Sequence, residues 1–290
     1  MRTSRAAASR SVYARVAVIT SANVPEPPAA ASADRKSLRL YLDGLAARFE
    51  TAAFLTDDPV QVPHRYTKQQ DVEIAGFLAA TFAWGQRPTI IAKTTELLAL
   101  MDDDPHAWIV GHREADRARL ERFVHRTFQP LDALYFVDRL QRHYRAHASL
   151  EDLFADGLPA GVEHVGPALR HFHDAFFDVD YAPQRTRKHV ATPARKSSCK
   201  RLNMFLRWMV RPAAGGVDFG LWRRIAPRQL VVPLDLHVQR VARSLGLLTR
   251  KQADWQAALE LTAALRALDP EDPARYDYAL FGLGVLERYG

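Results

Sequence analysis

The chain of 290 residues is predicted to be all-α, and three features of its sequence carry that prediction. Apolar residues recur at spacings of three and four from Asp34 onward, which is the periodicity of helices that bury one face. No convincing pair of strands joined by a hairpin turn is found. The sequence also lacks a glycine-rich phosphate loop and any internal repeat. With 48% hydrophobic residues, the chain can bury a sizeable core.

Five helices are predicted in the first part of the chain. They are expected over residues 38–49, 67–84, 88–100, 131–144 and 165–178. Thr67 and Gln70 have the spacing of a capping box at the start of the second helix. Pro88 suits the first turn of the third helix, and the acidic run Asp102–Asp104 before a proline ends it.

Four more helices are predicted after a run of helix-breaking residues at 192–198. The first opens at Lys200. The second follows Asp235, whose preceding proline and following apolar periodicity are typical of a helix N-cap. Thr249 and Gln252 form a second possible capping box before the third helix, and Asp272-Pro273 opens the last one.

Basic residues are concentrated in one part of the chain. The net charge is +7, of which residues 1–33 supply +3 from four arginines and one glutamate. Between Tyr181 and Val217 there is no Asp or Glu. That stretch contains nine basic residues, namely Arg185, Arg187, Lys188, Arg195, Lys196, Lys200, Arg201, Arg207 and Arg211. Such clustering suits a polyanion, so nucleic acid is the expected partner.

The helix that opens at Lys200 has two distinct faces on a helical wheel. Its apolar face carries Leu202, Phe205, Leu206 and Met209, and its polar face carries Lys200, Asn203, Arg207 and Arg211. The apolar face is expected to pack against the core, and the polar face is expected to look outward.

Lys200 and Asp235 together are a minimal set for attack on the sugar of a damaged nucleotide. The amine can form a Schiff base, and the carboxylate can stabilise a cationic sugar or move protons. Each residue also has a plain structural explanation, since Lys200 could belong to a solvated basic face and Asp235 could be a helix N-cap worth about 1 kcal/mol. Taken singly, neither residue is evidence of catalysis.

The two residues and their neighbours resemble the helix–hairpin–helix DNA glycosylase superfamily, which includes endonuclease III and the 8-oxoguanine glycosylases. Lys200 with Leu202–Leu206 is similar to the start of the second hairpin helix, and Pro233-x-Asp235-x-His237 is similar to the aspartate motif. Residues 77–87 are similar to an early helix that ends in a small residue and a glutamine. Residues 34–290 also resemble a bacterial family distantly related to these enzymes, which brings no established activity. This family is recognised by two motifs, Lys-Arg-Leu-Asn-Met-Phe-Leu-Arg-Trp-Met-Val-Arg and Asp-Tyr-Ala-Leu-Phe-Gly-Leu-Gly.

The resemblance implies a DNA glycosylase or abasic-site lyase that acts on a base turned out of the duplex. Lys200 would be the nucleophile and Asp235 would support charge on the sugar. Gln86 would fill the gap left by the base, and Trp84 and Trp222 are candidates for its pocket. The implied DNA-binding residues are Gln86, Arg87, Arg195, Lys196, Ser197, Ser198, Arg201, Arg207 and Arg211. Two lobes, about 68–211 and 34–55 with 233–290, would flank a cleft for the DNA.

The chain departs from the superfamily pattern in two places. Typical hairpins carry two glycines whose amides bind a phosphate, whereas residues 192–198 contain none. Phosphate contact would then depend on Arg195, Lys196, the serine hydroxyls and the following helix N-terminus. The gap from Lys200 to Asp235 is also longer than in endonuclease III, because of an insertion at Pro212–Leu230. Archaeal 8-oxoguanine glycosylases carry a similar insertion.

No cofactor is expected, because an iron–sulfur cluster needs four cysteines and the chain has only Cys199. No metal site is expected either, since His164, His171 and His173 lack partners at ligand spacing. No apolar stretch approaches the roughly 20 residues of a membrane helix, and one cysteine gives no disulfide framework. A cytoplasmic location is therefore expected. The composition of residues 1–33 suits a disordered tail, which we favour, and equally a transit peptide or an extension from an upstream start codon that is not used.

Two other functions are open at this point, as is the oligomeric state. A non-catalytic nucleic-acid-binding protein would keep the fold without the chemistry, which the missing hairpin glycines favour. An enzyme that acts on free nucleosides or on RNA fits the lysine and aspartate but leaves the basic stretch unexplained.

Overall fold

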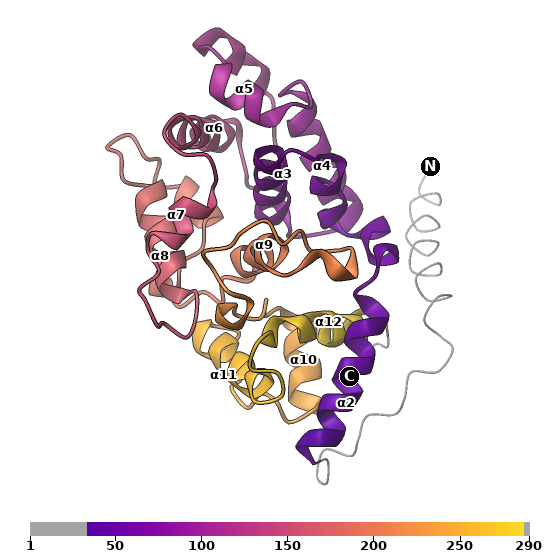
Figure 1. Ribbon diagram of the computed structural model, residues 1–290. Coiled ribbons are helices and arrows are strands. Elements are labelled where there is room, and N and C mark those ends of the chain that lie inside the picture. The colour runs from indigo at the N-terminus through magenta and orange to yellow at the C-terminus, as the bar shows by residue number, and fades with distance from the viewer. Residues whose placement is uncertain (1–33, 287–290) are drawn as a thin grey trace.

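The computed structural model describes residues 34–286, and this part of the chain is helical (Figure 1). Within it there is no β-strand, and the extended backbone forms only two isolated bridges, His125 with Phe128 and Ser197 with Asp254. The all-α prediction is therefore confirmed for the described residues. The predicted tail, residues 1–33, lies outside them.

The helices follow one another along the chain with short connections. They are α2 (Arg35–Phe49), α3 (Gln69–Phe82), α4 (Arg87–Ala99), α5 (Pro105–Gly111), α6 (Pro130–Tyr144), α7 (Glu151–Ala155), α8 (Gly166–Phe176), α9 (Lys200–Val210), α10 (Leu236–Ser244), α11 (Trp255–Arg266) and α12 (Asp277–Leu286). Turns of 3₁₀ helix join them: η1 (Ala52–Asp57), η2 (Pro59–Gln61), η3 (Pro63–Arg65), η4 (Glu114–Leu120), η5 (Thr186–His189), η6 (Pro193–Arg195), η7 (Ala213–Gly215), η8 (Pro227–Gln229) and η9 (Pro273–Tyr276).

All nine predicted helices are present, but the last begins at Asp277, after η9, and not at Asp272-Pro273, and two predicted caps are wrong. Lys68 is the N-cap of α3 and makes no side-chain cap, because Gln70 donates instead to the carbonyl of Ala148. Asp254 caps α11 by accepting from the amide of Ala257, while Thr249 is bonded to Glu260. The short helices α5 and α7 were not predicted, because 7 and 5 residues are too few to show a period.

Helix α9 lies in the middle of the molecule. In Figure 1, α3 to α8 lie on one side of it and α2, α10, α11 and α12 lie on the other. Helix α3 packs against α9, and α12 packs against both α2 and α10. Gly282 permits the α2–α12 contact, since a Cβ atom there would lie 2.3 Å from the ring of Phe49. Helix α9 therefore lies between these two groups of helices.

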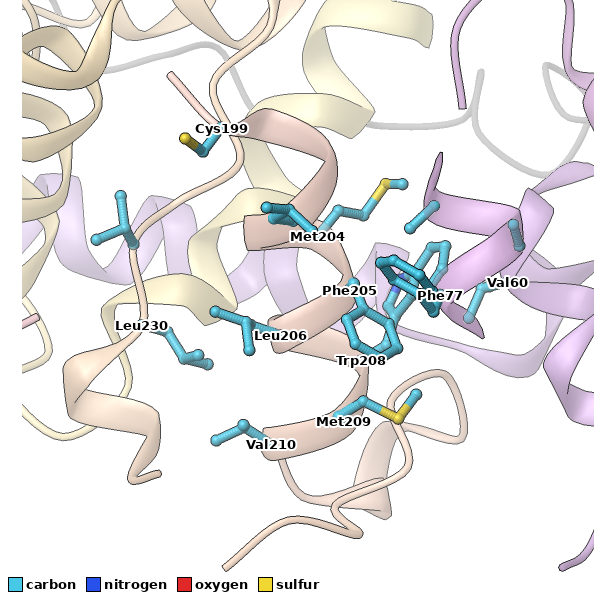
Figure 2. Close-up of a cluster of buried hydrophobic side chains, with 14 of the residues drawn as sticks. Val60, Phe77, Cys199, Met204, Phe205, Leu206, Trp208, Met209, Val210 and Leu230 are labelled. Atoms are coloured by element: carbon cyan, nitrogen blue, oxygen red, sulfur yellow. The ribbon is translucent and has the colours of Figure 1, made fainter. Parts of the chain in front are cut away.

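The side chains of α9 explain its central position. Figure 2 shows Phe205 beside Phe77 of α3, and Leu206 and Val210 on the side of Leu230. The rings of Phe205 and Phe77 are 5.7 Å apart. All nine residues of α9 after its first two are buried. Only the N-terminal end of this helix reaches the surface, and Lys200 is at that end.

A buried carboxylate attaches the insertion to α3. Glu73 is fully buried and accepts hydrogen bonds from five groups. The donors are Gln69 Nε2, Tyr144 Oη, Ser149 Oγ, the Leu150 amide and Trp222 Nε1, at 2.5 to 2.9 Å. Five donors replace the water that a buried carboxylate loses. Trp222 is therefore part of the core, where it also packs against Phe154 and Phe205.

Candidate functional site

Lys200 and Asp235 meet where α9 and α10 begin. The distance from Lys200 Nζ to Asp235 Oδ2 is 3.8 Å, and the two side chains are 28% and 23% exposed. Asp235 Oδ1 accepts hydrogen bonds of 2.9 Å from the amides of His237 and Val238, so the residue also caps α10. The carboxylate thus has two separate roles, because one oxygen holds the helix and the other faces the amine.

The turn before α9 takes a backbone conformation that usually favours glycine. Lys196 has φ 59° and Cys199 has φ 52°, both in the left-handed region. The Cys199 amide donates to Ser197 Oγ at 3.1 Å, and Ser198 Oγ donates to the Leu234 carbonyl at 3.3 Å. The turn therefore has a fixed shape without glycine, and it is attached to the segment that carries Asp235.

The cationic side chains of this turn are available to a ligand. Arg195 and Lys196 are exposed, and no acidic group forms an ion pair with either of them within residues 34–286. The backbone amides that open α9 lie beside them, and a helix N-terminus attracts anions. Ser197 and Ser198 are half-buried. Five residues predicted for the site, Lys200 and the four from 195 to 198, are thus brought together.

Asp277 is a buried acid close to the pair of Lys200 and Asp235, and it was not among the site residues predicted from the sequence. It is the first residue of α12, is 5% exposed, and is in contact with Nη1 of Arg207. Burial raises the pKa of Asp277 to about 6, with Asp235 and Asp218 adding to the rise, while Arg207 and Lys200 oppose it. A lone acid in the apolar motif Asp-Tyr-Ala-Leu-Phe-Gly-Leu-Gly was the signal that could have revealed it.

Asp277 should make the fold less stable as the pH rises. Its pKa is about 6 in the folded protein against an ordinary value of 3.8, so the folded state binds the extra proton between these values. The stabilisation is complete below about pH 4 and is lost as the pH rises through 6, by at most about 3 kcal/mol. We expect the unfolding free energy of the wild-type protein to fall relative to that of Asp277→Asn over this window. Parallel pH profiles for the two proteins would contradict this expectation.

The predictions for Arg207 and Arg211 are wrong, because both side chains are buried at 4% exposure. Arg207 is paired with Asp277 and Asp218. Arg211 is paired with Glu50 at 2.7 Å, Asp218 at 2.5 Å and Asp272 at 2.9 Å. Asn203 of the same face is 1% exposed and donates to the Ser198 carbonyl. This face of α9 is covered by acidic segments from elsewhere in the chain, so it cannot meet DNA.

Arg201 connects the site to the end of α3. Its guanidinium donates to the Thr81 carbonyl and lies 5.1 Å from the ring of Trp84. Burial lowers the pKa of Arg201 to about 10. The group is therefore bound inside the protein, and a phosphate would have to displace these contacts. The same contacts bring the loop that carries Gln86 next to the start of α9.

Trp84, Gln86 and Arg87 form the other edge of the site. Gln86 is exposed at the N-cap of α4, after Gly85 with φ 111°. Arg87 lies 4.8 Å from the ring of Phe281 in α12. Trp84 is half-buried, 5.8 Å from the ring of His189. The guanidinium groups of Arg201 and Arg126 lie over the Trp84 ring, 5.1 and 5.9 Å from its centroid. The prediction that Trp222 lines a base pocket is wrong, because this residue is 1% exposed and bonded to Glu73.

The described residues give no metal site and no membrane helix. Within residues 34–286, no three His, Cys, Asp or Glu side chains are grouped so as to hold a metal ion. No helix among them has the length and apolar character needed to cross a bilayer.

Comparison with known proteins gives one result. The family model described as "Protein of unknown function (DUF2400)" matches residues 58–286, which is most of the chain. No curated protein and no solved structure matches. The matched region includes α3 to α12 and thus every residue of the site described above.

Proposed function

The chain belongs to the DUF2400 family, and we propose that it binds DNA and acts as a glycosylase or abasic-site lyase. The observation that carries the proposal is the distance of 3.8 Å between Lys200 Nζ and Asp235 Oδ2 at the only end of α9 that reaches the surface. A buried ion pair far from the surface would serve structure alone. This pair is partly open to solvent, so a sugar can approach both groups.

The proposed reaction uses both groups in turn. Lys200, as the free amine, attacks C1′ of the sugar, and the N-glycosidic bond breaks with its electron pair leaving on the base, which is then protonated. The new amine nitrogen loses a proton and the sugar ring opens, which leaves an imine between Lys200 and C1′. Asp235 stabilises the positive charge on the sugar while these bonds change. On an existing abasic site the same amine forms the imine with loss of water.

The turn at 195–198 and the start of α9 would hold the DNA backbone. Arg195 and Lys196 supply charge, and the amides of α9 supply donors. In this proposal the helix groups on the two sides of α9 act as two lobes, and Gln86 and Trp84 contact the DNA at the opened base pair. A chromosomal substrate would place the protein in the cytoplasm of a bacterial cell.

Borohydride reduction tests the chemistry, because it fixes an imine as a stable covalent adduct. The protein would be incubated with duplexes that contain an abasic site or a damaged base, with sodium chloride replacing borohydride as the control. A shifted protein–DNA band on a denaturing gel is expected with at least the abasic duplex. Absence of an adduct from every duplex would leave a glycosylase without lyase activity or the non-catalytic binder.

A non-catalytic DNA-binding protein is the second candidate. It is favoured by the hydrogen bonds that Asp235 accepts from the amides of His237 and Val238, which give this residue a structural reason to be present. Lys200 would then be a partner for the capping carboxylate. DNA binding without base release or a trapped adduct would support this candidate over the enzyme.

Neutralising Arg195 and Lys196 should weaken binding to all DNA sequences by the same factor. The logarithm of the DNA association constant falls linearly with the logarithm of the salt concentration. We expect Arg195→Gln/Lys196→Asn to reduce the magnitude of this slope by about 2, roughly one for each lost phosphate contact. Asparagine is chosen at 196 because it tolerates the left-handed backbone there. Fluorescence anisotropy at several salt concentrations gives the slope. The control is Arg113→Gln/Arg122→Gln, which removes two exposed charges beside η4. An unchanged slope in the first variant would exclude this turn as the binding surface.

A further inference from the structure

The outer face of α10 is a second cationic surface. Residues 236–253 contain no Asp or Glu and include Arg240, Arg243, Arg250 and Lys251. The inner face of α10, with Val238, Gln239, Val241 and Ala242, is buried. The outer face is exposed, and with Lys251 it forms what we call the α10 surface: Leu236, His237, Arg240, Arg243 and Lys251.

No acidic side chain in the described part of the chain pairs with the cations of this surface. Among residues 34–286, Arg240, Arg243 and Lys251 form no ion pair. The acids on either side of this stretch have other partners, since Asp235 faces Lys200 and Asp254 is bound by Arg250 at 2.5 Å, and Glu260 accepts from Thr249. This is the opposite of the polar face of α9, where every arginine has acidic partners. Unpaired exposed cations attract an external polyanion.

Hydrogen bonds join the α10 surface to the turn at 195–198. Gln239 of α10 donates to the Lys251 carbonyl at 3.0 Å. The Trp255 amide donates to the Lys196 carbonyl at 3.2 Å, and Ser197 forms a backbone bridge with Asp254. The cations at 195 and 196, the loop at 251 and the face of α10 are therefore parts of one connected region, with the Lys200–Asp235 pair at the start of α10.

Leu236 gives this region an apolar contact point next to the pair. It follows Asp235 directly and is 57% exposed, one of the few large apolar side chains of the described residues with such exposure. An exposed leucine at the edge of a polar site is suited to pack against the flat face of a sugar or base, while the arginines beyond it meet phosphates.

We propose that the α10 surface binds the backbone of the same DNA and extends the phosphate contacts made by the turn at 195–198. Arg240, Arg243 and Lys251 contact phosphates, and Leu236 packs against the nucleotide at the pair. This inference rests on the proposed function, and it replaces the buried residues Arg207 and Arg211 with a different second set of phosphate contacts.

The test compares three double variants of the full chain on an abasic-site duplex. They are Arg240→Gln/Arg243→Gln, the turn variant Arg195→Gln/Lys196→Asn, and the control Arg113→Gln/Arg122→Gln, which removes two exposed charges on either side of η4. Each removes two positive charges, so an effect of net charge alone is the same in all three. We expect the α10 variant to lower the salt slope by about 2, as the turn variant does, and the control to leave it within about 0.5.

The outcomes separate the inference from the function on which it rests. If the turn variant loses affinity and the α10 variant behaves as the control, DNA binding stands and the α10 surface is not part of it. If the wild-type protein binds no DNA, both the inference and the proposed function fail. If the salt dependence of DNA binding decreases more in the α10 variant than in the control, the inference is supported, whatever the turn variant does.

Discussion

Replacing Lys200 with alanine is expected to abolish the borohydride-trapped adduct, a loss of at least about 100-fold in adduct yield. Lys200 is the lysine paired with Asp235, and the neighbouring Arg201 cannot take its place, because guanidinium groups do not form imines under these conditions. DNA binding should change by no more than about fivefold, since one ammonium among several cations contributes a small part of the electrostatic affinity. Gel analysis of the adduct and anisotropy of binding give the two readouts.

Asp235→Asn separates the chemical role of this residue from its cap. The amide oxygen of asparagine can accept from the same two backbone amides, so α10 keeps its N-cap and stability should fall by less than about 1 kcal/mol. The charge that faces Lys200 is lost, and base excision should slow by roughly 100-fold or more. Unchanged excision on a confirmed substrate would reduce Asp235 to a helix cap.

Lys200→Arg serves as the matched control for the first variant. It keeps the positive charge next to Asp235 and therefore keeps the electrostatic part of DNA binding. It cannot form the imine, so the adduct should be lost as completely as in Lys200→Ala. An adduct that persists in both variants would show that another group reacts, and the assignment of Lys200 would then be wrong.

Features set by neighbouring residues were predicted well. The start of α9 at Lys200 follows from the breaker run at 192–198, and the cap at Asp235 follows from the proline before it and the period after it. Each depends on atoms within a few residues along the chain. The capping boxes at Thr67 and Thr249 failed because groups outside the predicted boxes bind their members, namely the Ala148 carbonyl for Gln70 and the Glu260 carboxylate for Thr249.

The burial of Arg207 and Arg211 could not be predicted from α9 itself. A helical wheel shows which residues share a face but not what covers that face. Here the cover comes from Glu50 in the sequence after α2, Asp218 in the insertion, and Asp272 and Asp277 before and in α12. Trp222 was misassigned for the same reason, since its partner Glu73 is 149 residues away.

This acidic cover has a consequence for the site. Asp277 is held by Arg207 and lies close enough to Asp235 and Lys200 for their charges to act on it. The buried arginines therefore fix the position of the carboxylates behind the pair. A substitution in this network of arginines and carboxylates should therefore also change the surroundings of Lys200, through α9 and Asp277. The network itself is buried and does not contact DNA.

Asp218→Asn is expected to destabilise the fold by about 3–5 kcal/mol, because it leaves buried positive charge without its partner. Asp218 is 1% exposed and lies between two arginines, 2.5 Å from Arg211 Nη1 and 3.5 Å from Arg207 Nε. It also accepts from Tyr278 Oη at 2.8 Å. Asparagine has nearly the same size, so the packing is kept and only the charge is lost.

Asp102→Asn is the matched control for Asp218→Asn. Asp102 is paired with Arg119 at 2.7 Å, but the two side chains are 63% and 45% exposed. Water and salt screen such a pair, so its loss should cost no more than about 1 kcal/mol. The left-handed backbone of Asp102, with φ 59°, also tolerates asparagine. Urea unfolding of both variants measures the difference, and equal losses would mean that the buried network does not stabilise the junction of α9 with α12.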